Sequence, residues 1–239
     1  MFTTGLFGVI LIVMQHSDAF SAQDLVTSDI VVNSLMNRDR GFQGVNSYSR
    51  ELKMDLETWL RGRAAVGATV TWYDACCGRG RALIEAATIL SEYEPESSAL
   101  HGSDLLDDFL EHGDDVKLVA ADATGYSTDA RFELITCVHG IDYIGDKLGF
   151  LQSAYRLLAP GGVLCATMDL NNVMLNDRPV MSFSALLNWQ GVKLKFRDYI
   201  LRIERNDVPL TFKGSYAGAT PSSVPNSSGN QVIDSWYRA

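Results

Sequence analysis

The sequence predicts an α/β fold with a doubly wound, mostly parallel sheet and helices on both of its faces. From residue 69 onward, short apolar runs alternate with segments of helical periodicity, which is the pattern of repeated βαβ units. After about residue 185 two strand-like stretches joined by a turn replace this rhythm, and they indicate an antiparallel pair at the sheet edge. The 239 residues are 46% hydrophobic, which suits one large domain with a sizeable core.

Residues 1–67 are predicted to form an N-terminal segment and a helical cap. Between residues 24 and 67, apolar residues recur at three- and four-residue spacing in DLVTSDIVVNSLMN and SRELKMDLETWLRGRAA, which predicts helices. The apolar stretch GLFGVILIVM (5–14) is shorter than the ~20 residues that span a bilayer. No Lys or Arg precedes it, so we expect neither a membrane span nor a signal peptide.

Residues 68–239 are predicted to form the core, within one compact domain overall. Helices are expected at RALIEAATILSEY (81–93) and KLGFLQSAYRLL (147–158), the second ended by APGG. The predicted strands are TVTWYD (69–74), SALHGSD (98–104), VKLVAAD (116–122), RFELITCV (131–138) and GVLCATMDL (162–170). An antiparallel pair is expected from VKLKFRDYILRIER and VPLTFKGSYA, with its turn at Asn206-Asp207. The remaining end, TPSSVPNSSGNQVIDSWYRA, is expected to be a mobile tail or an irregular loop pinned by Trp236 and Tyr237.

Charge and cysteine usage restrict the classes of partner. The formal net charge of -9 argues against broad binding to nucleic acid, which needs clustered Lys and Arg, and it suits a small-molecule partner. The four cysteines form no CxxC pair, and no histidine lies at zinc-finger spacing, so no metal site is expected. We expect buried, reduced thiols in a cytoplasmic protein.

The stretch YDACCGRG joins the first predicted strand to the helix that follows it. A dinucleotide-binding loop needs G-x-G-x-x-G, but here Gly78 and Gly80 are followed by Leu83 in place of a third glycine. The chain also lacks the triphosphate-binding string G-x-x-x-x-G-K-[ST]. Asp74 lies four residues before Gly78, and a carboxylate beside a helix N-terminus repels phosphate and attracts an ammonium group. The turn therefore favours a ligand that carries adenosine and an amino acid, such as S-adenosylmethionine.

Two further acids follow the next two predicted strands. Asp104 is placed to accept hydrogen bonds from both hydroxyls of a ribose, and Asp122 from the amino group of an adenine. Strand-end aspartates also commonly cap a turn or the next helix, and this alternative stands for each acid taken singly. Three acids at three successive strand ends form a more specific pattern than any one of them.

Five segments, in this order along the chain, resemble the motifs of class I S-adenosylmethionine-dependent methyltransferases. They are YDACCGRG, HGSDLL, AADATGY, FELITCVHGIDYI and AYRLLAPGGVLCATM. The first resembles the motif Asp-x-Gly-x-Gly-x-Gly, with Cys76 in place of the first glycine. The resemblance implies a Rossmann-like sheet of seven strands with an antiparallel pair at the C-terminal end.

The resemblance also implies which residues bind the cofactor. The methionine part is expected near Asp74, Gly78 and Gly80, the ribose at Asp104, and the adenine beside Asp122 and Ala123. A side chain at position 76 is expected to require an ordinary backbone angle, where glycine would tolerate a positive φ. Arg79 is expected either to meet the methionine carboxylate or to be solvated. The full predicted cofactor set is Asp74, Cys76, Gly78, Gly80, Asp104, Leu105, Asp122, Ala123, His139 and Arg50.

The candidate catalytic residues lie in the loop after the fourth predicted strand and in the N-terminal cap. Methyl transfer depends mainly on proximity and orientation, and it needs a general base only if the acceptor must lose a proton. His139, Asp142 and Tyr143 are the candidates in the loop, where His139 has a suitable pKa for a base or else bonds to the backbone. Tyr143 or Tyr48 is a candidate to face the sulfonium.

The segment GVNSYSREL resembles N-terminal lids of small bacterial members of the family. The resemblance would make Asn46, Tyr48 and Arg50 part of a lid that excludes water. The alternative is a plain helix start that is capped by Ser47.

Three functions remain open from the sequence. The first is methyl transfer to a small-molecule acceptor, such as a metabolite or natural product. The second uses the same cofactor for alkyl transfer or for an intramolecular cyclisation or lyase reaction that releases methylthioadenosine. The third is a non-catalytic cofactor-binding module. An oxidoreductase is disfavoured, and it would predict NAD binding instead.

Overall fold

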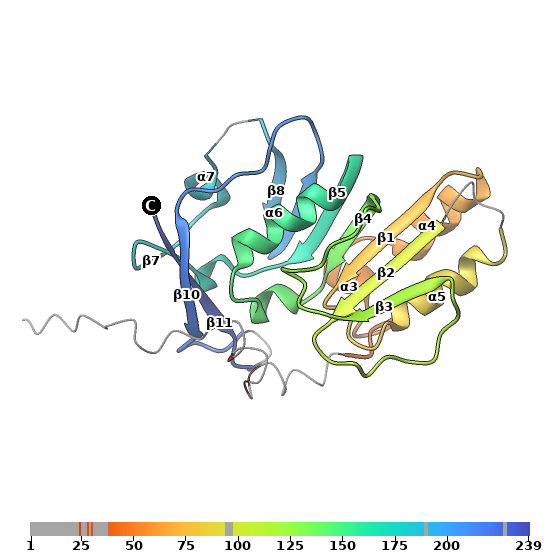
Figure 1. Cartoon of the computed structure of the whole chain (residues 1–239), viewed down its shortest axis with the longest axis horizontal. Coiled ribbons are helices and arrows are strands. Elements are labelled where there is room, and N and C mark those ends of the chain that lie inside the picture. The colour runs from red at the N-terminus through yellow and green to blue at the C-terminus, as the bar shows by residue number, and fades with distance from the viewer. Residues whose placement is uncertain are drawn as a thin grey trace, which may run out of the picture.

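The computed structural model describes residues 38–93, 98–188, 191–226 and 229–239, together with Asp24, Ser28 and Ile30. Within these residues the chain forms a seven-stranded sheet in the order β3-β2-β1-β4-β5-β9-β8 and a four-stranded sheet in the order β10-β11-β6-β7 (Figure 1). The large sheet consists of β1 (Val70–Ala75), β2 (Ser98–Asp104), β3 (Val116–Ala120), β4 (Phe132–Cys137), β5 (Leu158–Thr167), β8 (Lys193–Arg197) and β9 (Ile200–Glu204). The predicted α/β class and the mostly parallel, seven-stranded sheet are confirmed.

The five strands from β3 to β5 run parallel, so their carboxyl ends meet at one edge of the sheet. β1 lies between β2 and β4, and Asp74 is in register with Gly102 on one side and Thr136 on the other. The chain order reverses between β1 and β4, which is the switch point at which ligands bind in doubly wound sheets. The topology therefore brings the segments that follow β1, β2, β3 and β4 to a single place.

The large sheet is covered by helices on both faces, as predicted. Alternate residues of β1 point to opposite faces, so Trp72 belongs to the core that contains residues of α4 (Leu56–Ala65) and α5 (Arg81–Leu90), and Tyr73 to the core that contains residues of α6 (Lys147–Leu157). Trp72 is fully buried, and its indole Nε1 donates to Thr136 Oγ1 at 2.7 Å. The polar atom of this large side chain is therefore satisfied inside the core.

Among residues 38–67, two short helices begin at polar capping residues. Ser47 caps α3 (Tyr48–Leu52), where its side chain accepts from the Arg50 backbone N–H at 3.4 Å. Asp55 caps α4 and accepts from the Thr58 N–H at 3.0 Å. Residues 5–14 and most of residues 24–37 lie outside the described residues, and the predictions for them stay predictions. Within the ranges given above, no helix is long and apolar enough to cross a membrane.

The prediction of where the antiparallel hairpin turns was wrong. Both of its strands, β8 and β9, lie within the stretch expected to be a single strand, and they are joined by Asp198 and Tyr199. These two residues have φ angles of 53° and 63°, the left-handed conformation of the two-residue turns that match strand twist. β9 runs antiparallel to β5, while Asn206-Asp207 follows the hairpin.

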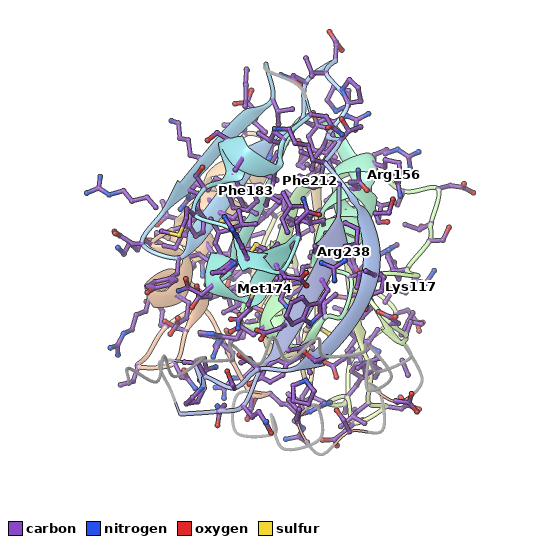
Figure 2. All side chains as sticks on the ribbon, turned by 90° about the vertical axis from the view of Figure 1, so that its left-hand side faces the viewer. Lys117, Arg156, Met174, Phe183, Phe212 and Arg238 are labelled. Carbon is purple, nitrogen blue, oxygen red and sulfur yellow. The ribbon has the colours of Figure 1, made fainter. Side chains whose placement is uncertain are left out.

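The prediction of a mobile or irregular C-terminal end was wrong where the chain forms strands, whereas residues 222–226 and 229–232 between those strands are irregular. β10 (Ser215–Pro221) and β11 (Ile233–Arg238) pair antiparallel, and β11 also pairs with β6 (Val173–Leu175), which in turn pairs with β7 (Arg178–Pro179). Figure 2 looks at this second sheet, with Met174 and Arg238 labelled on its neighbouring strands.

Two buried side chains fasten the second sheet to the rest of the molecule. Lys147 at the start of α6 donates to the carbonyl oxygens of Ile144 at 2.9 Å and Ile233 at 2.7 Å. Tyr237, expected to pin the chain end, is buried in the main core, and its hydroxyl donates to Asp146 at 2.9 Å. The C-terminal strands are therefore part of the packed structure.

The remaining helical elements are short. They are η3 (Gly140–Tyr143), η4 (Leu170–Asn172) and α7 (Phe183–Leu186). Of these, η3 follows β4 directly and so reaches the edge where the parallel strands end.

Candidate functional site

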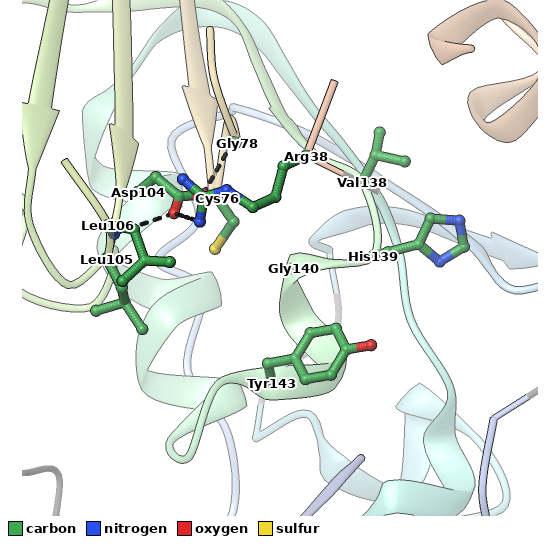
Figure 3. Close-up of a pocket in the computed structure, with 10 residues that line it drawn as sticks. All are labelled: Arg38, Cys76, Gly78, Asp104, Leu105, Leu106, Val138, His139, Gly140 and Tyr143. Carbon is green, nitrogen blue, oxygen red and sulfur yellow. Dashed lines mark hydrogen bonds and ion pairs between the residues drawn. The ribbon is translucent and has the colours of Figure 1, made fainter. Parts of the chain in front are cut away.

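A cleft opens at the carboxyl ends of β1, β2, β3 and β4. It consists of two adjoining pockets that share Cys76, Asp104, Leu105, Gly140 and Tyr143. The first, here called the Arg38 pocket, also contains Arg38, Gly78, Leu106, Val138 and His139. The second, the Asp122 pocket, also contains Ala121, Asp122, Ala123, Thr124, Ile144, Gly145, Asp146 and Tyr216. Figure 3 shows Arg38, Cys76 and Asp104 gathered together in the first pocket, with the rings of His139 and Tyr143 standing apart from them.

Cys76 lies where the two pockets meet. Its φ is 57°, so the expectation that a side chain here requires an ordinary backbone angle was wrong. The residue keeps the left-handed conformation that glycine adopts readily, at a cost of roughly 1–2 kcal/mol for a residue with a Cβ. A hydrogen bond with the Cys137 thiol, together with burial, raises the pKa of the Cys76 thiol. All four cysteines are free thiols.

The two glycines of the turn have different surroundings. A Cβ on Gly78 would lie 2.2 Å from the Arg38 carbonyl oxygen, so only glycine allows the residue 38 backbone to lie on the turn. Gly80 begins α5 with a φ of 79°, and a Cβ there would meet Leu118 at 2.5 Å. Gly78 borders the cleft, whereas Gly80 serves the start and packing of α5.

Asp104 ends β2 with its carboxylate in both pockets. Its Oδ1 accepts from Arg38 Nη1 at 2.9 Å and from the Leu106 N–H at 3.2 Å, and its Oδ2 accepts from the Gly78 N–H at 2.8 Å. The side chains of Arg38 and Asp104 are 9% and 12% exposed, so the ion pair is largely buried. This carboxylate is thus fixed in place by both the turn and the N-terminal segment.

Asp122, Ala123 and Leu105 also lie at the cleft, as predicted for a cofactor site. Asp122 is exposed, and it accepts from the Thr124 N–H at 2.9 Å and from Thr124 Oγ1 at 2.7 Å. Asp122 therefore caps its turn, which is the alternative that the sequence left open for a strand-end aspartate. It also lines the Asp122 pocket. Ala123 beside it is buried.

Asp74 is not at the cleft surface where the sequence interpretation placed it. The side chain is 1% exposed and accepts hydrogen bonds from Thr136 Oγ1 at 2.5 Å and from the Tyr48 hydroxyl. Burial raises the pKa of Asp74 to about 7. Tyr48 is itself buried, and burial together with the Asp74 charge raises its pKa. The hydrogen bond between Tyr48 and Asp74 therefore joins α3 to β1.

His139 lies at the edge of the Arg38 pocket in a constrained conformation. Its φ is 59°, and its backbone N–H donates to Thr167 Oγ1 at 2.7 Å. The ring nitrogen Nε2 is 3.0 Å from Glu51 Oε2, and both side chains are about one quarter exposed. A carboxylate in this position holds the imidazole ring in a fixed orientation.

Four other residues that the sequence singled out are less closely grouped. Tyr143 lines both pockets, and burial raises its pKa. Asp142 is buried beside it in η3, where burial raises the pKa of the carboxyl, and it does not line the cleft. Arg50 is exposed on α3 and donates to the Val45 carbonyl oxygen at 3.1 Å, away from both pockets. Arg79 is half-exposed, with its Nε 3.5 Å from Asp108.

The sequence interpretation missed three side chains that the fold brings to this region. Arg38 is 66 residues from Asp104, Glu51 is 88 residues from His139, and Tyr216 belongs to the unexpected second sheet. The run NRDRGF around Arg38 carries three charges between two stretches predicted to be helical, and these charges are the local signal that could have found it. No motif marks Glu51 or Tyr216.

The polar groups of the cleft suit a ligand with hydroxyls and a carboxylate better than a phosphate. Asp104 and Asp122 supply acceptors, and Arg38 supplies donors. Two of its atoms, Nε and Nη2, have no hydrogen-bond partner among the described residues. In the same part of the chain no group of three or more His, Cys, Asp or Glu could hold a metal ion. These groups fit S-adenosylmethionine.

Comparison with solved structures gives similarities of fold at low identity. A putative methyltransferase from Bacillus halodurans is 23% identical over 48% of this chain and 51% of its own, with a TM-score of 0.36. The N-methyltransferase NodS from Bradyrhizobium japonicum, in complex with S-adenosyl-L-homocysteine, is 14% identical over 75% of this chain and 100% of its own, with a TM-score of 0.42. A methyltransferase from Geobacter sulfurreducens, also in complex with S-adenosyl-L-homocysteine, is 21% identical over 47% of each chain, with a TM-score of 0.37.

The chain spans about half the length of the Bacillus halodurans protein, and similarities at this level identify no substrate. No curated protein sequence matches the chain. The model of a family described as a methyltransferase domain matches residues 50–200, from α3 to β9, which is more than half of the chain. The match contains the turn after β1, Asp104, Asp122 and the loop after β4, so the chain belongs to the methyltransferase domain family.

Proposed function

We propose that this chain transfers a methyl group from S-adenosyl-L-methionine to a small-molecule acceptor, a metabolite or natural product. One observation carries the proposal. Side chains from the ends of four successive parallel strands line a single cleft, and they lie within the residues that the family model matches. The sulfonium of the cofactor supplies an activated methyl group, and this chain would supply position and exclusion of water.

The proposed roles in cofactor binding follow the positions of the polar side chains. Asp104 accepts hydrogen bonds from the ribose hydroxyls, while Asp122 and Ala123 border the adenine. The backbone of Gly78 and the thiol of Cys76 face the middle of the cofactor, and Leu105 packs on the same part of it. Asp74 does not contact the cofactor in this proposal. It accepts the hydrogen bond of the Tyr48 hydroxyl and so fixes the position of α3. Asp104 fits its role best, because it reaches both pockets.

The acceptor is proposed to approach from the side of His139 and Tyr143. His139 would take a proton from an acceptor hydroxyl or amine, with Glu51 orienting the ring. Tyr143 would stand near the sulfonium. Support comes from the grouping of these residues at the Arg38 pocket, next to the residues proposed for the cofactor.

Three further proposals concern the chain as a whole. Residues 1–67 act as a cap and lid over a core of residues 68–239, with Arg38 in the wall of the cleft and α3 in contact with His139. A cytoplasmic location is supported by four free thiols. A small-molecule acceptor is supported over nucleic acid by the net charge of -9.

Binding of S-adenosylhomocysteine to the purified chain, measured by calorimetry, tests the cofactor assignment. We expect Asp104→Ala to weaken binding by about 1.5–3 kcal/mol, the usual value of hydrogen bonds that involve a charged group. Asp107→Ala, an exposed neighbour outside both pockets, serves as the matched control and should bind as the wild type does. Equal affinities of the Asp104→Ala variant and the wild type would remove Asp104 from the ribose role.

Mass spectrometry of reactions with S-adenosylmethionine and a panel of small acceptors tests the reaction itself. A product heavier by one methyl group, formed together with S-adenosylhomocysteine, is expected. Release of methylthioadenosine from S-adenosylmethionine alone would instead assign attack at another sulfonium carbon and overturn the methyl-transfer proposal.

A further inference from the structure

Arg38 is buried at the cofactor cleft with part of its hydrogen-bonding capacity unused. We infer that its guanidinium binds the carboxylate of the amino-acid part of S-adenosylmethionine. The inference rests on the proposed function and adds to it the residue that recognises the charged end of the cofactor.

The backbone of Arg38 is fixed on the glycine-rich turn. Its carbonyl oxygen accepts from the Arg79 N–H at 2.8 Å, and it lies where a Cβ of residue 78 would otherwise be. The N-terminal segment therefore reaches the turn at a defined point. From this point the side chain of Arg38 extends across Cys76 to Asp104 (Figure 3).

The side chain is 9% exposed and only partly paired. Nη1 donates to Asp104, but Nε and Nη2 have no hydrogen-bond partner among the described residues. Buried polar groups are nearly always hydrogen-bonded, because an unmet donor loses its bonds to water without compensation. Two unmet donors on one guanidinium, at the wall of a pocket, indicate that a ligand supplies the acceptors.

The guanidinium of Arg38 indicates which ligand group it binds. A guanidinium presents N–H groups in a planar fork that matches the two oxygens of a carboxylate. S-adenosylmethionine carries one carboxylate and no phosphate, so this group is the strongest acceptor that the cofactor offers. Asp104 keeps two backbone partners, the N–H groups of Gly78 and Leu106, and stays satisfied if Arg38 turns to the ligand.

Two ligands that differ in the amino-acid part, and hence in this carboxylate, test the inference. S-adenosylhomocysteine has the amino-acid part, whereas 5′-methylthioadenosine has the same adenosine and thioether without it. For Arg38→Gln we expect the affinity for S-adenosylhomocysteine to fall about ten- to hundredfold, as for a lost hydrogen bond to a charged group. The affinity for methylthioadenosine should change less than twofold. Arg38→Lys keeps the charge but not the planar pair of N–H groups. We expect it to lower the affinity for S-adenosylhomocysteine by less, again without changing the affinity for methylthioadenosine.

The control is Arg81→Gln, which changes a half-exposed arginine of α5 that pairs with Glu85. It should leave both affinities unchanged. An equal loss of affinity for both ligands in Arg38→Gln would limit Arg38 to holding Asp104. A higher affinity for both ligands would mean that Arg38 blocks the cleft. Either result overturns the inference, as does an unchanged affinity. If the folded wild type binds neither ligand, the proposed function fails instead.

Discussion

Asp74 is a fully buried carboxyl, and its protonation links the fold to pH. The folded state raises its pKa from 3.8 to about 7, chiefly because burial penalises the charged form. Between these two values the unfolded chain has released the proton while the folded chain retains it. A rise in pH therefore favours unfolding in this window, and the stabilisation present below pH 3.8 is lost by about pH 7.

The substitution Asp74→Asn tests this linkage, since it removes the titration and keeps the shape. We expect the free energy of unfolding of the wild type to fall relative to that of the variant by about 2–4 kcal/mol between pH 4 and pH 7. Urea unfolding at several pH values measures it, with Asp107→Asn as an exposed control. Parallel curves for Asp74→Asn and the wild type would contradict the burial of a titrating carboxyl.

At the residue scale the sequence predicted the position of the strand-end residues better than the orientation of their side chains. Asp104, Asp122 and Cys76 were placed at the strand ends by the βαβ pattern alone, and they line the cleft. Asp74 follows the same pattern, yet its side chain lies on the buried face of β1 that carries Trp72, where Tyr48 and Thr136 bind it. The face of a strand-end residue depends on its register within the strand, and a boundary uncertain by one residue reverses it.

At the scale of elements, strands buried on both faces were the easiest to predict. β4 reads as a mostly apolar run interrupted by Glu133, and it is buried over most of its length. The hairpin of β8 and β9 was missed because its turn, Asp198-Tyr199, lacks glycine and sits inside an alternating pattern. The paired residues of β6 and β11 in the second sheet, such as Val173 and Ser235, are 62 positions apart, and such pairing leaves no local signal.

Lys147 joins two of these elements, α6 and β11. It is fully buried, its Nζ donates to Ile144, Ile233 and Ser235, and burial lowers its pKa to about 8. Lys147→Met keeps the length but leaves the buried acceptors unmatched, so we expect a loss of about 2–4 kcal/mol in the free energy of unfolding. Urea unfolding measures the loss, and Lys213→Met is the exposed control. An unchanged unfolding midpoint would show that Lys147 does not hold the second sheet.

At the scale of the whole molecule, the cleft draws on parts far apart in the sequence. Arg38 comes from the N-terminal segment, Asp104 and Asp122 from the centre of the chain, and Tyr216 from the second sheet. A ligand that bridges these parts binds the folded state and has no such site in the unfolded chain. It therefore stabilises the native state by mass action.

Thermal unfolding in the presence of S-adenosylhomocysteine tests this coupling over the whole chain. At a ligand concentration of about 100 times Kd the stabilisation is about 2.7 kcal/mol, which for a chain of this size raises Tm by about 5–10 °C. NAD should produce no shift, because the turn after β1 lacks the third glycine of a dinucleotide site. Asp104→Ala should shift the response to higher concentrations of S-adenosylhomocysteine without abolishing it, because the remaining strand-end groups still contact the ligand. A Tm raised by NAD and unmoved by S-adenosylhomocysteine would assign the cleft to a different cofactor, since only the ligand that the folded cleft binds draws the unfolding equilibrium toward the native state.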